Sequence, residues 1–377
     1  MTDSSPPTVE SFRAAAARWL AEHAGEAPPD YGAICPPQLV EAGATWHRRL
    51  HAAGYAGIHW PTEYGGRGLT PDHNAVWQLE CARAGAPAAF NMVGLVLTAQ
   101  ALLQLGTPEQ RAEHLPLTVA ADRLWCQLFS EPGSGSDLAS LSTFAERDGD
   151  RFVVNGQKVW CSGGRYSGWG ILLARTDRDA PQHQGISFFL VDMATPGVDV
   201  RPLRQMTGDA EFDEVFFTDA VIPAANLLGP LHGGWSVAMQ VLTNERGHIG
   251  TAVVGLERRL EQMARLADAR DLDPIQRQEL AELIARGTAY RSLAQRQGAG
   301  ATTAGSLLKL GITEMSFDAA MMRADLAGAH SILDGSEASG MLAAPGGRIA
   351  GGTSQVQRNI IGERLLGLPR EPKPQET

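Results

Sequence analysis

The chain has 377 residues, a formal net charge of −10 and 44% hydrophobic residues. This length exceeds what one small core serves, so we expect two or three domains. The acidic balance argues against nucleic acid as the main partner, because no Lys/Arg cluster would neutralise its phosphates. The four cysteines include no Cys-x-x-Cys pair, so we expect no metal site. Neither a signal peptide nor a run of about 18 apolar residues is visible, which indicates a cytoplasmic protein without a membrane span.

The first part of the chain, from residue 8 to about 120, is predicted to be helical. The stretch VESFRAAAARWLAEHA places apolar residues at helical spacing. Gly106-Thr107-Pro108-Glu109 combines a helix stop, an N-cap and a proline at the first helical position. A Pro/Gly-rich loop from His59 to Asp72 separates the helical stretches. We therefore expect an N-terminal helical domain over residues 1–121.

At about Asp122 the pattern changes to alternating residues and turn dipeptides. Asp148-Gly149 and Asn155-Gly156 flank the run DRFVV, and together they are a strong hairpin signal. Further strands are predicted at GWGILLARTD, GISFFLVDM, VDVRPLRQM and DEVFFTDAVIP. These segments predict a middle β-barrel domain over residues 122–230.

Helical periodicity resumes at Trp235 and continues to the C-terminal part. One long amphipathic helix is expected from Trp235 to Arg270, and two more at DPIQRQELAELIARGTAYRSLAQ and GSLLKLGITEMSFDAAMMRADLAGAHSIL. A last helix accompanies the segment GGTSQVQRNIIGERLLG. The fold class is therefore an α+β multi-domain protein, with a C-terminal four-helix bundle over residues 231–377.

Two segments of the β domain could contact a ligand. The loop SEPGSGSDL, Ser130 to Leu138, has glycines and small hydroxyl residues that can bring backbone N–H groups close to a ligand. A tight surface turn explains the same composition equally well. In KVWCSGG, Trp160 could stack on a flat ring, although a tryptophan considered alone is more often a core residue.

A carboxylate interrupts the apolar face of the long helix. Steps of three and four residues place Glu245 on the same face as Val241, Ile249 and Leu256. Burial of a carboxylate is costly unless it is paired or functional, and desolvation would raise its pKa toward that of a general base. A buried glutamate paired with Arg246 or another arginine explains the pattern equally well.

Five segments in this order resemble the acyl-CoA dehydrogenase family over nearly the whole chain: WPTEYGGRG, SEPGSGSDL, NGQKVWCSGG, RQMTGDAEFDEVFFTDAVIP and GGTSQVQRNIIGERLLG. The resemblance implies a flavoprotein with FAD that removes a proton from Cα and a hydride from Cβ of an acyl-CoA thioester. It also implies electron transfer to an electron-transfer flavoprotein and assembly as a homo-dimer or tetramer. Composition and spacing alone do not indicate FAD.

The resemblance also assigns roles to individual residues. Flavin contacts are implied for Leu128 through its backbone and for Ser130, Trp160, Ser162, Thr353 and Gln355. Substrate contacts are implied for Ser136 at the pantetheine part and for Arg246 at the CoA. The backbone N–H of Gly351 is implied as a hydrogen-bond donor to the thioester carbonyl.

The chain departs from the family pattern at two places. Most members have Glu-Gly-Thr where this chain has Gly351-Gly352-Thr353, so the usual base is absent. A minority of members place the base in a Glu-Arg pair on the long helix, which here is Glu245-Arg246, and that arrangement accompanies branched or bulky acyl groups. The usual adenine-side FAD motif is replaced by ADARDLDPIQRQEL. This second departure leaves the alternative of a non-catalytic or half-site subunit of a heterotetramer. The absence of the usual base leaves the alternative of a flavin-dependent oxidase or monooxygenase of the same fold.

Overall fold

The computed structural model describes residues 6–32, 34–247, 260–261, 263–265, 272–296, 302–333 and 335–370; for 242–247, 295–296 and 302–304 it describes the backbone only. Its contacts group into two units, Met1–Asn244 and Glu245–Thr377. The first unit contains the N-terminal helices and the β-sheet, and the second contains the C-terminal helices. The boundaries at 121/122 and 230/231 stay predictions, since the unit division falls at neither.

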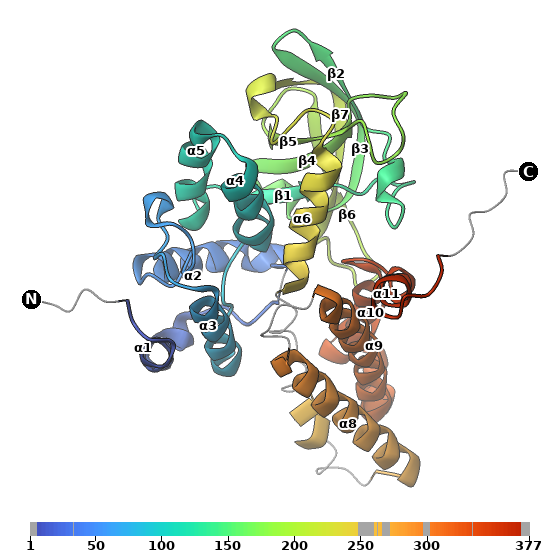
Figure 1. The fold of residues 1–377 in the computed structure, drawn as a ribbon. Coiled ribbons are helices and arrows are strands. Elements are labelled where there is room, and N and C mark those ends of the chain that lie inside the picture. Colours follow the sequence, from blue (N-terminus) through green and yellow to red (C-terminus); the bar gives the residue numbers. More distant parts are fainter. Residues whose placement is uncertain are drawn as a thin grey trace, which may run out of the picture. The chain divides into compact units, whose positions relative to one another are not determined.

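The N-terminal helices form where the sequence predicts them (Figure 1). They are α1 (Val9–His23), α2 (Val40–Ala52), α3 (Pro71–Ala84), a π-helical turn (Val93–Thr98), α4 (Ala99–Leu105) and α5 (Pro108–Val119). Thr107 caps α5 in a reciprocal capping box with Gln110, which satisfies backbone N–H groups at the helix start. Aromatic side chains fill the space between α1, α2 and α3, including Tyr55 and Trp77 stacked at 4.3 Å.

The middle of the chain forms one seven-stranded sheet in the order β1-β4-β2-β3-β7-β6, with β5 paired to β4. The strands are β1 (Trp125–Leu128), β2 (Phe144–Asp148), β3 (Arg151–Ser162), β4 (Trp169–Arg175), β5 (Ile186–Asp192), β6 (Val198–Leu203) and β7 (Phe212–Pro223). The hairpin predicted at Asp148-Gly149 is confirmed, since β2 and β3 pair antiparallel with Asp148 opposite Arg151. Gly149 has φ +64°, as a tight hairpin turn requires.

The second turn dipeptide, Asn155-Gly156, was predicted wrongly as part of a hairpin turn. It lies inside β3, where two residues of β7, Thr218 and Asp219, oppose Asn155. The Asn155 side chain accepts a hydrogen bond from the Asp219 backbone N–H at 2.9 Å and donates to its carboxylate at 3.0 Å. A Cβ at position 156 would lie 2.5 Å from Thr143 Oγ1, so the glycine permits a close approach at a β-bulge rather than a turn.

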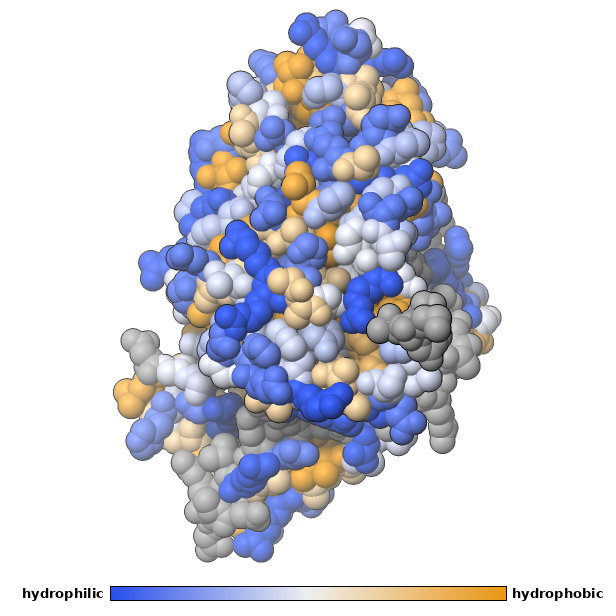
Figure 2. Space-filling model, turned by 90° about the vertical axis from the view of Figure 1, so that its left-hand side faces the viewer, coloured by the Kyte–Doolittle hydropathy of each residue, from blue (hydrophilic) through white to orange (hydrophobic). Residues whose placement is uncertain are grey.

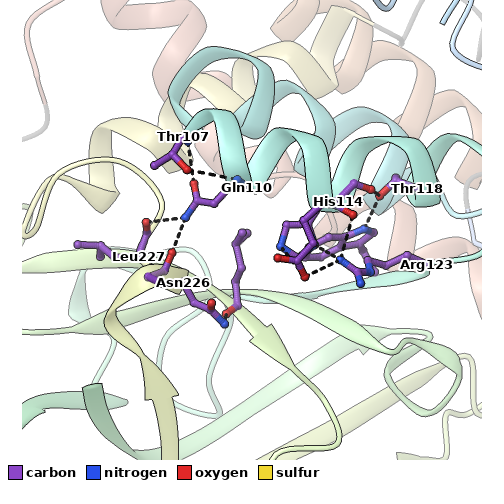
Figure 3. Close-up of polar contacts among 11 residues, drawn as sticks. Thr107, Gln110, His114, Thr118, Arg123, Asn226 and Leu227 are labelled. Atoms are coloured by element: carbon purple, nitrogen blue, oxygen red, sulfur yellow. Dashed lines mark hydrogen bonds and ion pairs between the residues drawn. The ribbon is translucent and has the colours of Figure 1, made fainter. Parts of the chain in front are cut away.

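The helices and the sheet of the first unit share one hydrophobic core. Leu102 and Leu115 from α4 and α5 pack with Ile171 and Phe188 from β4 and β5. Gln110 fixes α5 to the segment after β7, because its Nε2 donates to the carbonyls of Ala225 at 2.8 Å and Leu227 at 3.0 Å. Figure 3 shows this contact and, beside it, the hydrogen bond from the Thr118 hydroxyl to the His114 carbonyl. The shared core explains why both parts form a single unit.

The outer face of the molecule shown in Figure 2 is a mosaic in which small groups of hydrophobic residues are scattered among hydrophilic ones. No helix of the described residues is long and apolar enough to cross a membrane.

The second unit is built from α8 (Pro274–Arg296), α9 (Thr302–Ala327), α10 (Ser336–Ile349), α11 (Ser354–Ile360) and a π-helical turn (Ile361–Leu365) (Figure 1). Leu308, Ile312 and Met315 of α9 pack against Leu280 and Leu283 of α8. The sequence did not predict α10, whose interior contains Pro345 and several glycines that oppose a helix. The long helix expected from Trp235 is described as α6 (Gly234–Gly247), and most of its remainder lies outside the described residues.

Candidate functional site

An exposed tryptophan is the most unusual feature of the sheet. Val159 and Trp160 of β3 oppose a single residue of β7, Glu214, and this bulge turns Trp160 outward with 55% of its surface exposed. The reading of Trp160 as a core residue is therefore wrong. Its φ of +61° is a left-handed conformation that costs about 1–2 kcal/mol in a non-glycine residue. The surrounding structure has to compensate this strain, which is a pattern typical of functional sites.

The bulge connects β3 to the loop that follows β1. The Val159 N–H donates to the Ser130 carbonyl at 2.9 Å. The Trp160 ring packs edge to face on Phe212, with centroids 5.6 Å apart. Ser162 ends β3 and pairs with Phe212. Ser130, Trp160 and Ser162 are thus brought together at one end of the sheet.

The loop Ser130 to Leu138 is a tight turn that also borders a cavity. Glu131 and Ser134 exchange backbone hydrogen bonds of 2.9 and 3.0 Å, and the Ser134 hydroxyl donates to the Asp137 carbonyl. Ser136 is exposed in the bend that follows this turn. A cavity of about 310 Å³ is lined by Glu131, Pro132, Gly133, Ser134, Ser140, Ser142 and Gln157. Both interpretations of the loop therefore fit its geometry.

A buried ion pair that the sequence reasoning missed lies under this loop. The fully buried Lys158 Nζ donates to Glu131 Oε1 at 2.8 Å and to the Phe129 carbonyl at 3.0 Å. The Glu131 carboxylate also accepts the backbone N–H groups of Ser142 and Thr143 and the Ser142 hydroxyl. Burial by itself would raise the pKa of Glu131, but the Lys158 charge and these hydrogen bonds lower it to about 2. A lysine at an inward position of a strand, two residues after Gly156, was the available signal.

A second buried carboxylate, also missed, fixes the turn after Ser162. Asp213 is fully buried and accepts the Arg165 backbone N–H at 2.9 Å and its Nε at 2.6 Å. Burial raises the pKa of Asp213, and its hydrogen bonds to Arg165 oppose that shift. The Ser162–Gly163 segment is therefore held against β7 by a charged anchor.

The polar groups at this end of the sheet are suited to a flat heterocycle. Leu128 is fully buried at the end of β1, so only its backbone can reach a ligand. Ser130 and Ser162 are half-buried, and no hydrogen bond within the described part of the chain engages their hydroxyls. An exposed aromatic ring flanked by available hydroxyls can stack on a planar ring and hydrogen-bond to its edge. These residues fit a flavin ring by the chemistry of their donors.

In the second unit, Gly351 and Gly352 form a left-handed loop before α11. Their φ values are +64° and +90°, and no hydrogen bond within the described residues engages their backbone N–H groups. The Thr353 hydroxyl caps α11 by accepting the Val356 N–H at 3.2 Å, and Gln355 is exposed. The loop thus offers backbone donors to a ligand.

Two side chains hold this loop in place through its carbonyl groups. Lys309 of α9 donates to the Gly352 carbonyl at 2.7 Å, and Gln357 Nε2 donates to the carbonyls of Gly351 and Gly352 at 3.2 and 3.4 Å. A Cβ at position 351 would meet no atom nearer than Lys309 Cε at 3.9 Å. Space for a side chain therefore remains at position 351, but its left-handed backbone favours glycine.

The predicted base, Glu245, and its neighbour Arg246 lie in the C-terminal turns of α6, and their side chains fall outside the described residues. Val237, Ala238 and Val241, earlier on the same helix, are buried. The apolar stripe is thus confirmed as far as Val241.

Comparison with known proteins identifies the family. Models described as the acyl-CoA dehydrogenase N-terminal, middle and C-terminal domains match residues 6–122, 126–220 and 232–366. Acyl-CoA dehydrogenase IpdE1 of Mycobacterium tuberculosis is 41% identical over 97% of this chain and 99% of that protein. The chain therefore belongs to the acyl-CoA dehydrogenase family, and it is an oxidoreductase that acts on CH–CH bonds.

Solved structures agree with this assignment. The ChsE4-ChsE5 complex from Mycobacterium tuberculosis has a TM-score of 0.80 and 27% identity, covering 98% of this chain and 100% of that chain. The Tcur3481-Tcur3483 steroid ACAD has a TM-score of 0.84 and 26% identity, with 98% and 100% covered. The predicted fold class and the predicted family are confirmed.

Proposed function

We propose that this chain binds FAD and dehydrogenates an acyl-CoA thioester with a branched or bulky acyl group to the α,β-enoyl-CoA. The observation that carries the proposal is the exposed, strained Trp160 beside the available hydroxyls of Ser130 and Ser162, in a chain of this family. Bound FAD would supply the two-electron acceptor for the hydride that leaves Cβ. A steroid-derived acyl group is the favoured substrate class, because one similar structure is named a steroid ACAD.

In this scheme the residues of the first unit bind the flavin and orient the substrate. With FAD bound, Trp160 would stack on the flavin ring, Ser130 and the Leu128 backbone would hydrogen-bond to its pyrimidine edge, and Ser162 would contact its N5 side. Ser136 reaches the pantetheine part of the substrate from its exposed position on the loop. Thr353 and Gln355 are proposed as further residues that would contact the flavin.

Proton removal from Cα is assigned to Glu245. A glycine stands at the position of the usual base, and the left-handed φ of Gly351 favours it over any other residue. By sequence spacing, Glu245 falls on the apolar stripe whose earlier members are buried, where a carboxylate is costly unless it is paired or functional. Arg246, next to it, supplies a charge for CoA.

The backbone N–H of Gly351 is proposed to donate a hydrogen bond to the thioester carbonyl. Hydrogen bonds to the thioester carbonyl stabilise the negative charge that develops on oxygen as the Cα proton leaves. The N–H is free of partners within the described residues, and Lys309 and Gln357 hold the adjoining carbonyls. A rigid donor of this kind costs no reorganisation during the reaction.

The test is to purify the chain with FAD and to follow flavin bleaching with straight-chain, branched and steroid-derived acyl-CoAs. Glu245→Gln should abolish bleaching and leave FAD binding intact, whereas Glu279→Gln, an exposed glutamate of α8, should change neither. Retained bleaching in Glu245→Gln would place the base elsewhere. A flavoprotein that no acyl-CoA reduces, with or without a partner subunit, would refute the dehydrogenase proposal.

A second candidate is a half-site subunit of a heterotetramer. It is favoured by the altered adenine-side segment and by the similar structure that is a complex of two named chains, ChsE4 and ChsE5. Co-expression with a related acyl-CoA dehydrogenase discriminates, since FAD and activity would then appear only in the mixed assembly. Electron-transfer flavoprotein is the proposed acceptor, and hydrogen peroxide formed during turnover would instead favour an oxidase or monooxygenase.

A further inference from the structure

The buried pair Lys158–Glu131 joins three segments that are distant in the sequence. Lys158 is the last β3 residue that pairs with β7 before the bulge. Its Nζ reaches across to the Phe129 carbonyl and to Glu131, and Glu131 in turn holds Ser142 and Thr143. The end of β1, the following loop and β3 are therefore fastened at one point.

Ser130 is held on both sides by this arrangement. The carbonyl before it, on Phe129, accepts from Lys158, and its own carbonyl accepts from the Val159 N–H. The residue after it, Glu131, carries the carboxylate of the pair. The position of Ser130 relative to Trp160 thus depends on whether Lys158 stays charged and bound.

The strained backbone of Trp160 depends on the same group of buried hydrogen bonds. The hydrogen bond from the Val159 N–H to the Ser130 carbonyl fixes the bulge in the conformation that turns Trp160 outward. Lys158 lies immediately before these two residues, and its ammonium group has no water to replace its partners because it is fully buried. Loss of either charge leaves the other buried and unpaired, so the local structure must rearrange.

We propose that Lys158 and Glu131 are positioning residues, which set the geometry of Ser130 and Trp160 and thereby how tightly the flavin ring is held. This inference rests on the proposed function, since it takes this end of the sheet to be the flavin site. It assigns no contact between the pair and the flavin.

The experiment measures FAD affinity of the full-length protein by flavin fluorescence, together with the flavin absorption spectrum and reduction potential. Lys158→Met should raise the FAD dissociation constant at least tenfold and shift the potential. The double variant Lys158→Met/Glu131→Gln should recover part of the affinity, because it leaves no unpaired buried charge. Arg151→Met is the matched control: Arg151 lies on the same strand as Lys158, its exposed pair with Asp148 of β2 is broken, and neither the affinity nor the potential should change.

A second control separates positioning from loss of stability. Ile222→Ala removes a buried side chain of β7 in the same sheet without touching the pair. If it weakens FAD binding and shifts the potential as much as Lys158→Met does, the role of the pair is only structural and the inference fails. Hydrogen exchange of the FAD-free protein should increase at residues 129–131, 142–143 and 159 in Lys158→Met but not in Ile222→Ala.

The remaining outcomes are also decisive. Unchanged affinity, spectrum and potential in a folded Lys158→Met protein would overturn the inference and leave the proposed function intact. Wild-type protein that binds no FAD, alone or with a partner subunit, would overturn both. If Lys158→Met does not fold, Glu131→Gln and the double variant provide the same comparison, and equal affinity in both would refute the positioning role.

Discussion

Protonation of His47 should destabilise the first unit at mildly acidic pH. His47 of α2 is 1% exposed; its Nε2 donates to the Val119 carbonyl at 3.0 Å, and its Nδ1 accepts the Phe90 N–H at 3.2 Å. Only the neutral ring can do both. Burial lowers the pKa of His47 to about 4, against roughly 6.5 in the unfolded chain.

The difference between these two pKa values sets the direction and the size of the stability change with pH. Between the two pKa values the unfolded state binds more protons, so stability is full above pH 6.5 and falls as the pH drops toward 4. At about 1.36 kcal/mol per pKa unit, the whole shift is worth about 3.4 kcal/mol, of which about 2 kcal/mol is lost by pH 5. Burial also lowers the pKa of His114 to about 4, with the Arg123 charge acting in the same direction, so the wild type should lose more than His47 alone accounts for.

The assay is urea unfolding followed by tryptophan fluorescence at pH 8 and pH 5, for the wild type and for His47→Gln. The variant starts less stable, but its loss between the two pH values should be smaller than that of the wild type by about 2 kcal/mol. An equal loss in both proteins would show that His47 is protonated in the folded state without cost. That result would refute the reasoning.

Three other variants test an ion pair, hydrogen bonds and a glycine turn of the first unit by the same unfolding measurement. Asp213→Asn should lower the free energy of unfolding by about 1.5–3 kcal/mol, because it removes a charge-assisted hydrogen bond to Arg165; no change would contradict the anchor after Ser162. Gln110→Ala should cost about 1–3 kcal/mol by leaving two carbonyls without their donor. Gly197→Ala should cost on the order of 1–3 kcal/mol, since its φ is +92° and the new Cβ would lie 2.2 Å from the Thr218 carbonyl.

The order of helices and strands was predictable because hydrophobic periodicity reports local burial directly. The N-cap at Thr107 and the hairpin at Asp148-Gly149 form as their sequence signals require. Asn155-Gly156 misled because the same dipeptide that favours a turn also suits a bulge, and only the pairing with β7 distinguishes them. Pro345 and its neighbouring glycines hid α10, which packs along α9 in spite of its low intrinsic propensity.

The loops of the candidate site could be predicted from the sequence, but the bulge and the buried ion pairs that hold these loops could not. Phe152, Val154 and Lys158 point inward at even positions of β3, and strict alternation places Trp160 inward as well. The bulge reverses this alternation, so Val159 and Cys161 become the buried residues instead. The partners of Lys158 and Asp213 come from segments far away in the sequence, and no local pattern announces them.

Because of the bulge in β3, the number of residues in this strand affects the functional site. With one residue fewer between Lys158 and Cys161, β3 would pair with β7 in regular register from Gly156 to the end of the strand. The core on either side could then form as it does now, and the protein could fold with nearly the same composition. If Val159 were the residue removed, Trp160 would still face outward by strict alternation, but the hydrogen bond from Val159 to the Ser130 carbonyl and the left-handed backbone of Trp160 would be lost. A single-residue deletion here should therefore be tolerated by folding and rejected by function, the reverse of what is expected for most deletions inside strands.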